Sequence, residues 1–353
     1  MEFTGTDRRD TINGTEDDDV IHGLASNDRL IGHGGDDLID GGLGFDSLFG
    51  GDGDDTLQGG GHDDDADGGL GDDLIEGGDG DDYLVDSSGF DTLLGGAGID
   101  ELIVLDGGDR LEGGDGDDEL HVEAKHAQGE TTVLGGAGDD FVVLRHVGFS
   151  ALISLGKGTD VANLNAATAL TVMGGGGDDF IRPGAADAIG RLIAMGGAGD
   201  DQIVLAMAHG NEGLRRGDGG SGADMMIVGC FGKTRVTLGE GSDQLIFSQP
   251  DDLGVLSETV VRIADFQAGD GGDSIDVDYL FRGFFGLDWT SPGDLFELGY
   301  LRVVEEGSAT CVEVDFDADG GAYGWTRVGA LAGVDAADLT AANFNGYDPD
   351  AAP

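Results

Sequence analysis

The chain has 353 residues, of which 71 are glycine, 72 are acidic and only 17 are lysine or arginine, so the formal net charge is −55 at pH 7. This charge excludes a nucleic-acid-binding protein, which needs a basic surface. Of the acids, 15 are glutamate and 57 are aspartate. The preference for aspartate beside so much glycine indicates turns and metal ligands, and a chain of this composition needs a repeat or a bound ion to order it.

The sequence shows no membrane span and no conventional signal peptide. Its longest apolar stretch, residues 141–155, is interrupted by Arg145 and His146, and a span needs about 20 apolar residues. The first residues lack a basic start followed by an apolar run, which leaves cytoplasmic residence or a C-terminal export signal. Cys230 and Cys311 match no metal spacing, and one bridge or two free thiols are both open.

Aspartate recurs every nine residues over residues 5–121, without a slip. A well-formed copy reads GGDGDDYLV at residues 77–85, and two places after each aspartate stands Ile or Leu, except at Ala66. Such a period indicates a solenoid. The aspartates of this series are Asp10, Asp19, Asp28, Asp37, Asp46, Asp55, Asp64, Asp73, Asp82, Asp91, Asp100, Asp109 and Asp118.

Each nonapeptide is expected to form one turn and one short strand. Glycines at the first, second and fourth positions should take left-handed torsions, and the apolar residue should point inward. Two nonapeptides then close an 18-residue coil, and coils stack as parallel strands with aspartates along both edges. Carboxylate and carbonyl oxygens in such turns suit Ca²⁺ better than Mg²⁺ or zinc. The expected fold is an all-β parallel β-roll or β-solenoid.

Beyond residue 122 only one edge keeps the acidic turns. The motif continues at intervals of 19 to 23 residues, with longer and less acidic loops between the copies. This pattern predicts three regions: a two-edged calcium β-roll at 1–122, a widened one-edged solenoid at 123–247 and a β-rich C-terminal cap at 248–353. The later aspartates are Asp140, Asp160, Asp179, Asp201, Asp224 and Asp243.

Counting the gaps between successive turns on both edges gives about 17 calcium sites as an upper limit. Neutralisation at these sites would remove much of the self-repulsion that opposes compaction. We expect Asp179→Asn to loosen the middle coils, and Asp187→Asn in an opposite loop to do little.

These nonapeptides resemble those of the RTX (repeats in toxin) family, whose GGxGxDxUx repeats form a calcium-binding β-roll. The resemblance implies export by a type I secretion transporter through an uncleaved C-terminal signal, and folding outside the cell when calcium is met. Residues 261–277 and 321–344 resemble the C-terminal targeting segment of RTX secretion substrates. The implied location is extracellular or at the cell surface.

Three function classes follow, and the first is favoured. The first is a structural component of the extracellular matrix or cell surface. The second is a carbohydrate-binding or accessory module that holds a cell-surface polysaccharide. The third is a solenoidal polysaccharide-modifying enzyme, which is disfavoured because neither HExxH nor GxSxG occurs and repeats and cap account for every segment.

The N-terminal register suggests self-assembly. Counting back nine residues from Asp10 places Met1 at the aspartate position and Phe3 at the apolar position. The first coil is then incomplete, and a strand with unpaired backbone groups invites a second subunit. A head-to-tail contact of this kind would propagate into a calcium-dependent filament or layer.

Overall fold

The computed structural model describes residues 1–123, 129–145, 150–165, 167–183, 189–205, 213–229, 233–248, 261–277, 280, 295–296, 298–315 and 325–345. The chain divides into two compact units, Met1–Met173 and Gly174–Pro353. Both are built of β-strands, and two short 3-10 turns lie near the end of the described residues. The described part contains no helix with the length and hydrophobicity needed to cross a membrane.

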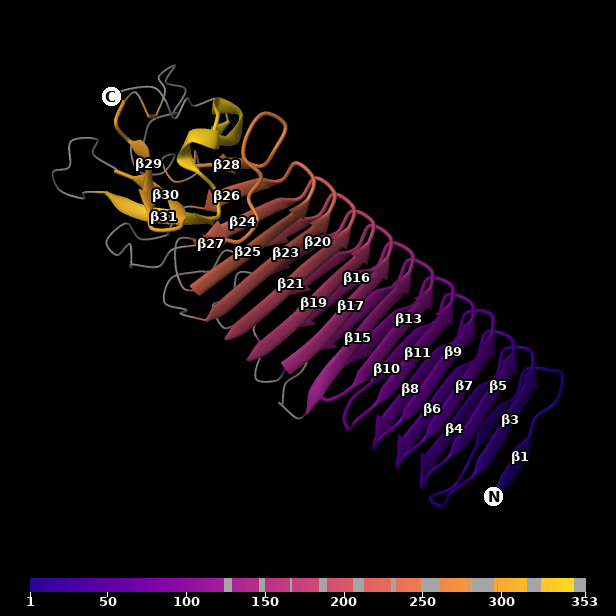
Figure 1. Cartoon of the computed structure of the whole chain (residues 1–353). Helices are drawn as coiled ribbons and strands as arrows, with labels where there is room; N and C mark the ends of the chain where they lie inside the picture. The colour runs from indigo at the N-terminus through magenta and orange to yellow at the C-terminus, as the bar shows by residue number, and fades with distance from the viewer. Residues whose placement is uncertain are drawn as a thin grey trace. The chain divides into compact units, whose positions relative to one another are not determined.

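The first unit is a parallel β-solenoid in which each coil gives one strand to each of two sheets (Figure 1). The strands of the first sheet are β1 (Glu2–Thr4), β3 (Val20–Ala25), β5 (Leu38–Leu43), β7 (Thr56–Gly61), β9 (Leu74–Asp79), β11 (Thr92–Ala97), β13 (Arg110–Asp115), β15 (Glu130–Ala137) and β17 (Ser150–Lys157). The strands of the second sheet are β2 (Thr11–Asn13), β4 (Arg29–Gly34), β6 (Ser47–Asp52), β8 (Asp65–Leu70), β10 (Tyr83–Asp86), β12 (Glu101–Val104), β14 (Glu119–Glu123), β16 (Phe141–Arg145) and β18 (Val161–Leu164). Strand β19 (Ala169–Gly176) runs across the division between the units.

The strand register confirms the 18-residue coil. Phe3 pairs with Ile21, and Ile21 pairs with Ile39, in parallel strands. The Ile and Leu positions from Ile21 to Leu120 are fully buried, and Ala66 is 4% exposed. A ladder of apolar side chains therefore fills the space between the two sheets.

The turn glycines do not all behave as the sequence pattern predicts. In the repeat at 41–49, Gly42 and Gly44 have φ values of 100° and 145°, whereas Gly41 is not left-handed and lies inside strand β5. The prediction of left-handed torsion is therefore wrong for the first glycine. Because this glycine has no side chain, a carboxylate oxygen and a carbonyl oxygen can approach it closely.

The first sheet widens after residue 122, as predicted. Strands β3 to β13 of this sheet have six residues, whereas β15 and β17 have eight. The extra residues lie at the edge that loses the acidic turns, and most of the loops at that edge, including Asp187, fall outside the described residues.

The second unit continues with the same construction and adds an antiparallel hairpin. Its first sheet contains β21 (Arg191–Ala198), β23 (Leu214–Ser221), β25 (Lys233–Glu240), β27 (Val261–Ile263), β31 (Thr326–Ala332), β30 (Ala309–Val314) and β29 (Leu301–Glu306). Its second sheet contains β20 (Phe180–Pro183), β22 (Gln202–Val204), β24 (Met225–Gly229), β26 (Gln244–Ser248) and β28 (Ser274–Asp276). β31 pairs in parallel with β27 and antiparallel with β30.

Two 3-10 turns, η1 (Ala336–Asp338) and η2 (Ala341–Phe344), end the described chain. Phe344 is fully buried and meets the ring of Phe296 edge-on. Cys311 is a buried free thiol, and Cys230 lies outside the described residues.

Candidate metal sites along the turns

All 19 predicted ligands lie in the described part of the chain, and 18 of them are buried. Those from Asp19 to Asp243 are at most 3% exposed, and Asp10 is half-buried. Because a carboxylate is costly to bury without a partner, each of these side chains needs a specific explanation.

In most of these aspartates one carboxylate oxygen, Oδ1, accepts a hydrogen bond from the neighbouring coil. The backbone N–H of Asp46 donates to Oδ1 of Asp64 at 2.7 Å, and the N–H of Asp64 donates to Oδ1 of Asp82 at 2.8 Å. The opposite edge repeats the arrangement, with the N–H of Asp37 donating to Oδ1 of Asp55 at 2.8 Å. In the second unit the N–H of Asp201 donates to Oδ1 of Asp224 at 2.9 Å. The aspartates thus form hydrogen-bonded ladders along the turns.

In most of these aspartates the second carboxylate oxygen, Oδ2, is buried without a hydrogen-bond partner. This is an exception to the rule that buried polar atoms are paired, and it points to a missing ligand. The residues whose Oδ2 atoms are orphaned in this way include Asp28, Asp37, Asp46, Asp55, Asp64, Asp73, Asp82, Asp100, Asp109, Asp118, Asp140, Asp201, Asp224 and Asp243.

The orphaned oxygens share a small space with glycine carbonyls. A Cβ atom placed on Gly41 would lie 2.6 Å from Oδ2 of Asp46 and 2.8 Å from the carbonyl oxygen of Gly59 in the next coil. A Cβ on Gly23 would likewise lie 2.7 Å from Oδ2 of Asp28 and 2.6 Å from the oxygen of Gly41. The first glycine of the motif therefore keeps open a space that a carboxylate and a carbonyl oxygen face. Hard oxygen donors of this kind fit calcium.

The buried position also changes the acidity of these groups. Burial raises the pKa of Asp55, Asp64 and Asp82 to about 7, although each accepts a backbone hydrogen bond that opposes the shift. The charges of neighbouring aspartates contribute to this raised pKa. Near neutral pH these carboxyl groups can therefore give up a proton and bind a cation in its place.

Sequence reasoning missed Asp273, which ends the ladder in the second unit. Its side chain is fully buried, and its Oδ1 accepts from the N–H of Asp243 at 3.1 Å. Its Oδ2 accepts from the N–H of Gln267 at 2.7 Å, so neither oxygen is orphaned. The signal was present, because Asp273 follows two glycines and precedes Ile275 by two places.

Sequence reasoning also missed Asp86, which takes the place of the first glycine in the repeat DSSGFDTLL at 86–94. Carboxylate oxygens of Asp73, Asp86 and Asp91 lie within 4.8 Å of one another, and all three residues are buried. The Oδ2 atoms of Asp73 and Asp86 are without hydrogen-bond partners. Burial, followed by the charge of Asp91, raises the pKa of Asp86 to about 10. This edge therefore offers one site with a third side-chain carboxylate.

A family model that consists of four copies of the RTX calcium-binding nonapeptide repeat matches five stretches of the chain, at residues 4–39, 40–75, 76–103, 94–124 and 171–187. Residues 4–124 are RTX calcium-binding repeats. The RTX match covers the region where both edges carry aspartate ladders, and repeats of this type are typical of secreted proteins. It does not include 261–277 or 321–344, so the secretion segment stays a prediction. A search of the curated proteins gave no match to the chain.

Proposed function

We propose that this RTX protein is a secreted structural component of the extracellular matrix or cell surface that folds when it binds calcium. The observation that carries the proposal is the orphaned Oδ2 atom, which recurs along the turns and faces a glycine carbonyl. On this proposal the chain is a scaffold and not an enzyme.

Within each turn the roles of the residues are distinct. The Oδ1 atom of the aspartate fixes the adjacent coil through a backbone N–H, so the carboxylate is already oriented. The Oδ2 atom and the carbonyl oxygen of the first glycine would hold the ion. Calcium supplies positive charge that offsets the burial of these carboxylates. The upper limit of about 17 ions remains part of the proposal.

Export by a type I secretion transporter that reads residues 248–353 is a further part of the proposal. Its support is the occurrence of RTX repeats at 4–124. In a host carrying such a transporter, the whole chain should reach the medium and residues 1–247 alone should not. Equal export of both chains would exclude a signal in this region.

Self-association is supported by apolar side chains on one edge of the roll. Leu24, Leu43 and Phe45 are 46%, 60% and 50% exposed. Leu24 and Leu43 lie near the ends of the paired strands β3 and β5, and Phe45 lies in the turn that follows β5. Exposed apolar groups that gather in this way mark contact surfaces. We therefore propose that molecules associate through this apolar edge.

Sedimentation velocity at millimolar calcium tests the association. The parent protein should form oligomers, and a Leu43→Asp/Phe45→Asp variant should sediment as a folded monomer. Leu70→Asp is the matched control, because Leu70 is 52% exposed on the opposite edge. A parent protein that stays monomeric would remove the assembly role and leave calcium-dependent folding intact.

A further inference from the structure

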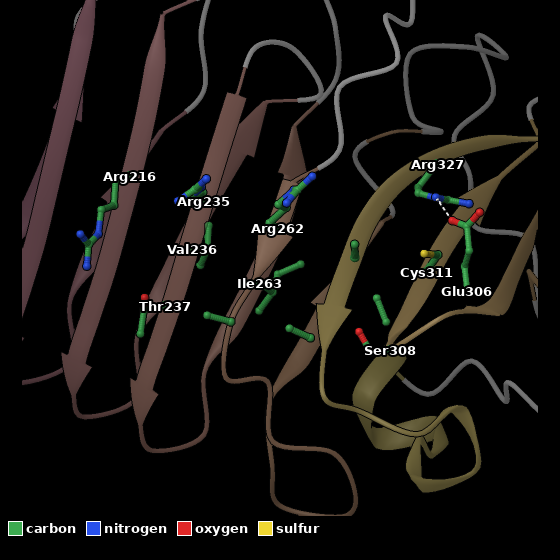
Figure 2. A pocket seen from close by; sticks show the side chains of 14 residues that line it. Arg216, Arg235, Val236, Thr237, Arg262, Ile263, Glu306, Ser308, Cys311 and Arg327 are labelled. Atoms are coloured by element: carbon green, nitrogen blue, oxygen red, sulfur yellow. Dashed lines mark hydrogen bonds and ion pairs between the residues drawn. The ribbon is translucent and has the colours of Figure 1, made fainter.

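The second unit carries a row of arginines on the outward face of its first sheet. Arg216 on β23 pairs with Arg235 on β25, which pairs with Arg262 on β27. All three side chains are exposed, and Figure 2 shows them on three successive strands. Neighbouring strands lie about 4.8 Å apart. The register therefore sets three positive charges in a row at regular spacing.

This row is unusual for the chain. Arg216 and Arg235 stand four residues before the second glycine of the motif, Gly220 or Gly239. At this position strands β3 to β15 of the first sheet carry Val20, Leu38, Thr56, Leu74, Thr92, Arg110 and Thr132, of which only Arg110 is a cation. A concentration of arginine on a protein of net charge −55 is not explained by solubility.

The arginines of the row are not neutralised by close ion pairs within the protein. Arg216 reaches the carboxylate of Asp218 only at 4.0 Å. Within the described residues, Arg235 and Arg262 make neither a hydrogen bond nor an ion pair. Arg327, in contrast, is held by Glu306 and by Glu313, as the dashed line to Glu306 in Figure 2 illustrates. Arg235 and Arg262 thus present cations that are free to bind an anion, and Arg216 is held only weakly.

The row borders a cavity of about 660 Å³. Arg262 pairs with Ala330 on β31, and the small side chains of Ala264, Ala330 and Ala332 make that part of the lining shallow. Thr237 and Ser308 add hydroxyl groups. The described lining contains no aromatic residue. This is a volume in the range of small-ligand sites, with several donors on one wall.

We infer that this cavity binds an anionic oligosaccharide, with Arg216, Arg235 and Arg262 contacting acidic groups on successive sugars. The planar guanidinium fork recognises carboxylate and sulfate oxygens through paired N–H groups. A polysaccharide with one acidic group per sugar repeats its charge at a spacing close to that of the strands. The hydroxyls of Thr237 and Ser308 can pair with sugar hydroxyls. Nucleic acid fits less well, because the lining offers no aromatic platform for bases.

The site goes beyond the calcium-folded scaffold, and calorimetry with short oligomers tests it. The probes are a tetramer of galacturonate, a sulfated tetramer of similar length and a neutral galactose tetramer. Free calcium is held constant, because uronates bind calcium themselves. An acidic tetramer should bind, its affinity should fall as salt rises, and the neutral tetramer should not bind. The acidic tetramer that binds more tightly identifies carboxylate or sulfate as the natural acidic group.

Two double variants distinguish binding by the arginine row from an effect of the protein's overall charge. Arg235→Gln/Arg262→Gln should weaken binding at least about tenfold, because two charge-assisted contacts are lost. Arg29→Gln/Arg110→Gln removes the same two charges from the first unit and should leave the affinity unchanged. Circular dichroism shows that both variants are folded. The inference is overturned if neither acidic tetramer binds, if the neutral tetramer binds equally, or if the two variants behave alike.

Discussion

The two oxygens of each repeat aspartate have different surroundings, so a single substitution can separate their roles. In Asp82→Asn the amide oxygen can still accept from the N–H of Asp64, but the anionic Oδ2 is lost. We expect the calcium-loaded protein to lose about 1–3 kcal/mol of unfolding free energy, as for a buried polar group deprived of its partner. Denaturant unfolding at saturating calcium measures this loss.

Asp79→Asn is the matched control for this change. Asp79 lies in the same repeat and is exposed, so the same loss of charge should cost less than about 0.5 kcal/mol. Equal losses for the two variants would mean that net charge, and not the buried oxygen, determines the stability.

The first glycine of the motif gives a second residue-scale prediction. In Gly41→Ala the new methyl group would meet Oδ2 of Asp46 at 2.6 Å and the oxygen of Gly59 at 2.8 Å. It would fill the space between the ligands, so calcium affinity should fall and stability should drop by about 1–3 kcal/mol. At Gly176 an added Cβ meets no atom within 4 Å, and Gly176→Ala should be tolerated. Calorimetric calcium titration compares the two variants. Similar calcium affinities would contradict the assignment of the space beside Gly41 as a calcium site.

Asp86 gives a third prediction at the scale of the residue. With three buried carboxylates, the site of Asp73, Asp86 and Asp91 should hold a cation more tightly than a site built on the regular motif. Terbium luminescence should show a first equivalent that binds tightly, and Asp86→Asn should weaken that step about tenfold or more. Unchanged binding of the first equivalent in Asp86→Asn would place the tightest site elsewhere.

At the scale of the strand and turn, the features that follow directly from the nine-residue period could be predicted from the sequence. The nine-residue spacing fixes which Ile or Leu points inward, and the pairing of Ile21 with Ile39 follows from it. The division of labour between Oδ1 and Oδ2 could not be predicted, because it depends on the N–H of the adjacent coil. The arginine row could not be predicted either, since Arg216, Arg235 and Arg262 are separated by unequal intervals that only the loop lengths bring into register.

The ladders also predict a pH dependence of the calcium-free protein. Burial raises the pKa of Asp55, Asp64 and Asp82 to about 7, from an ordinary value of 3.8. Groups whose pKa is raised by folding stabilise the fold fully below 3.8 and lose that contribution as pH rises through about 7. Calcium-free protein should therefore show more β-structure at pH 5 than at pH 8, by circular dichroism of metal-stripped samples. The opposite trend would mean that these carboxyls are not buried without calcium.

At the scale of the whole molecule, net charge opposes folding. The chain carries −55, and 18 of its 72 acidic groups are buried aspartates of the two ladders. The core between the sheets consists of one ladder of Ile and Leu from each sheet in most coils of the first unit. Because the core is so thin, we propose that calcium makes the compact state favourable.

The central claim is that calcium binding and folding are one event, and a calcium titration followed by far-ultraviolet circular dichroism at pH 8 tests it most directly. The chelated protein should lack the β-signal and should gain it cooperatively as free calcium rises through about 10⁻⁴ to 10⁻³ M, the range of extracellular sites. A chelated protein that keeps its full β-signal at pH 8 would contradict the account.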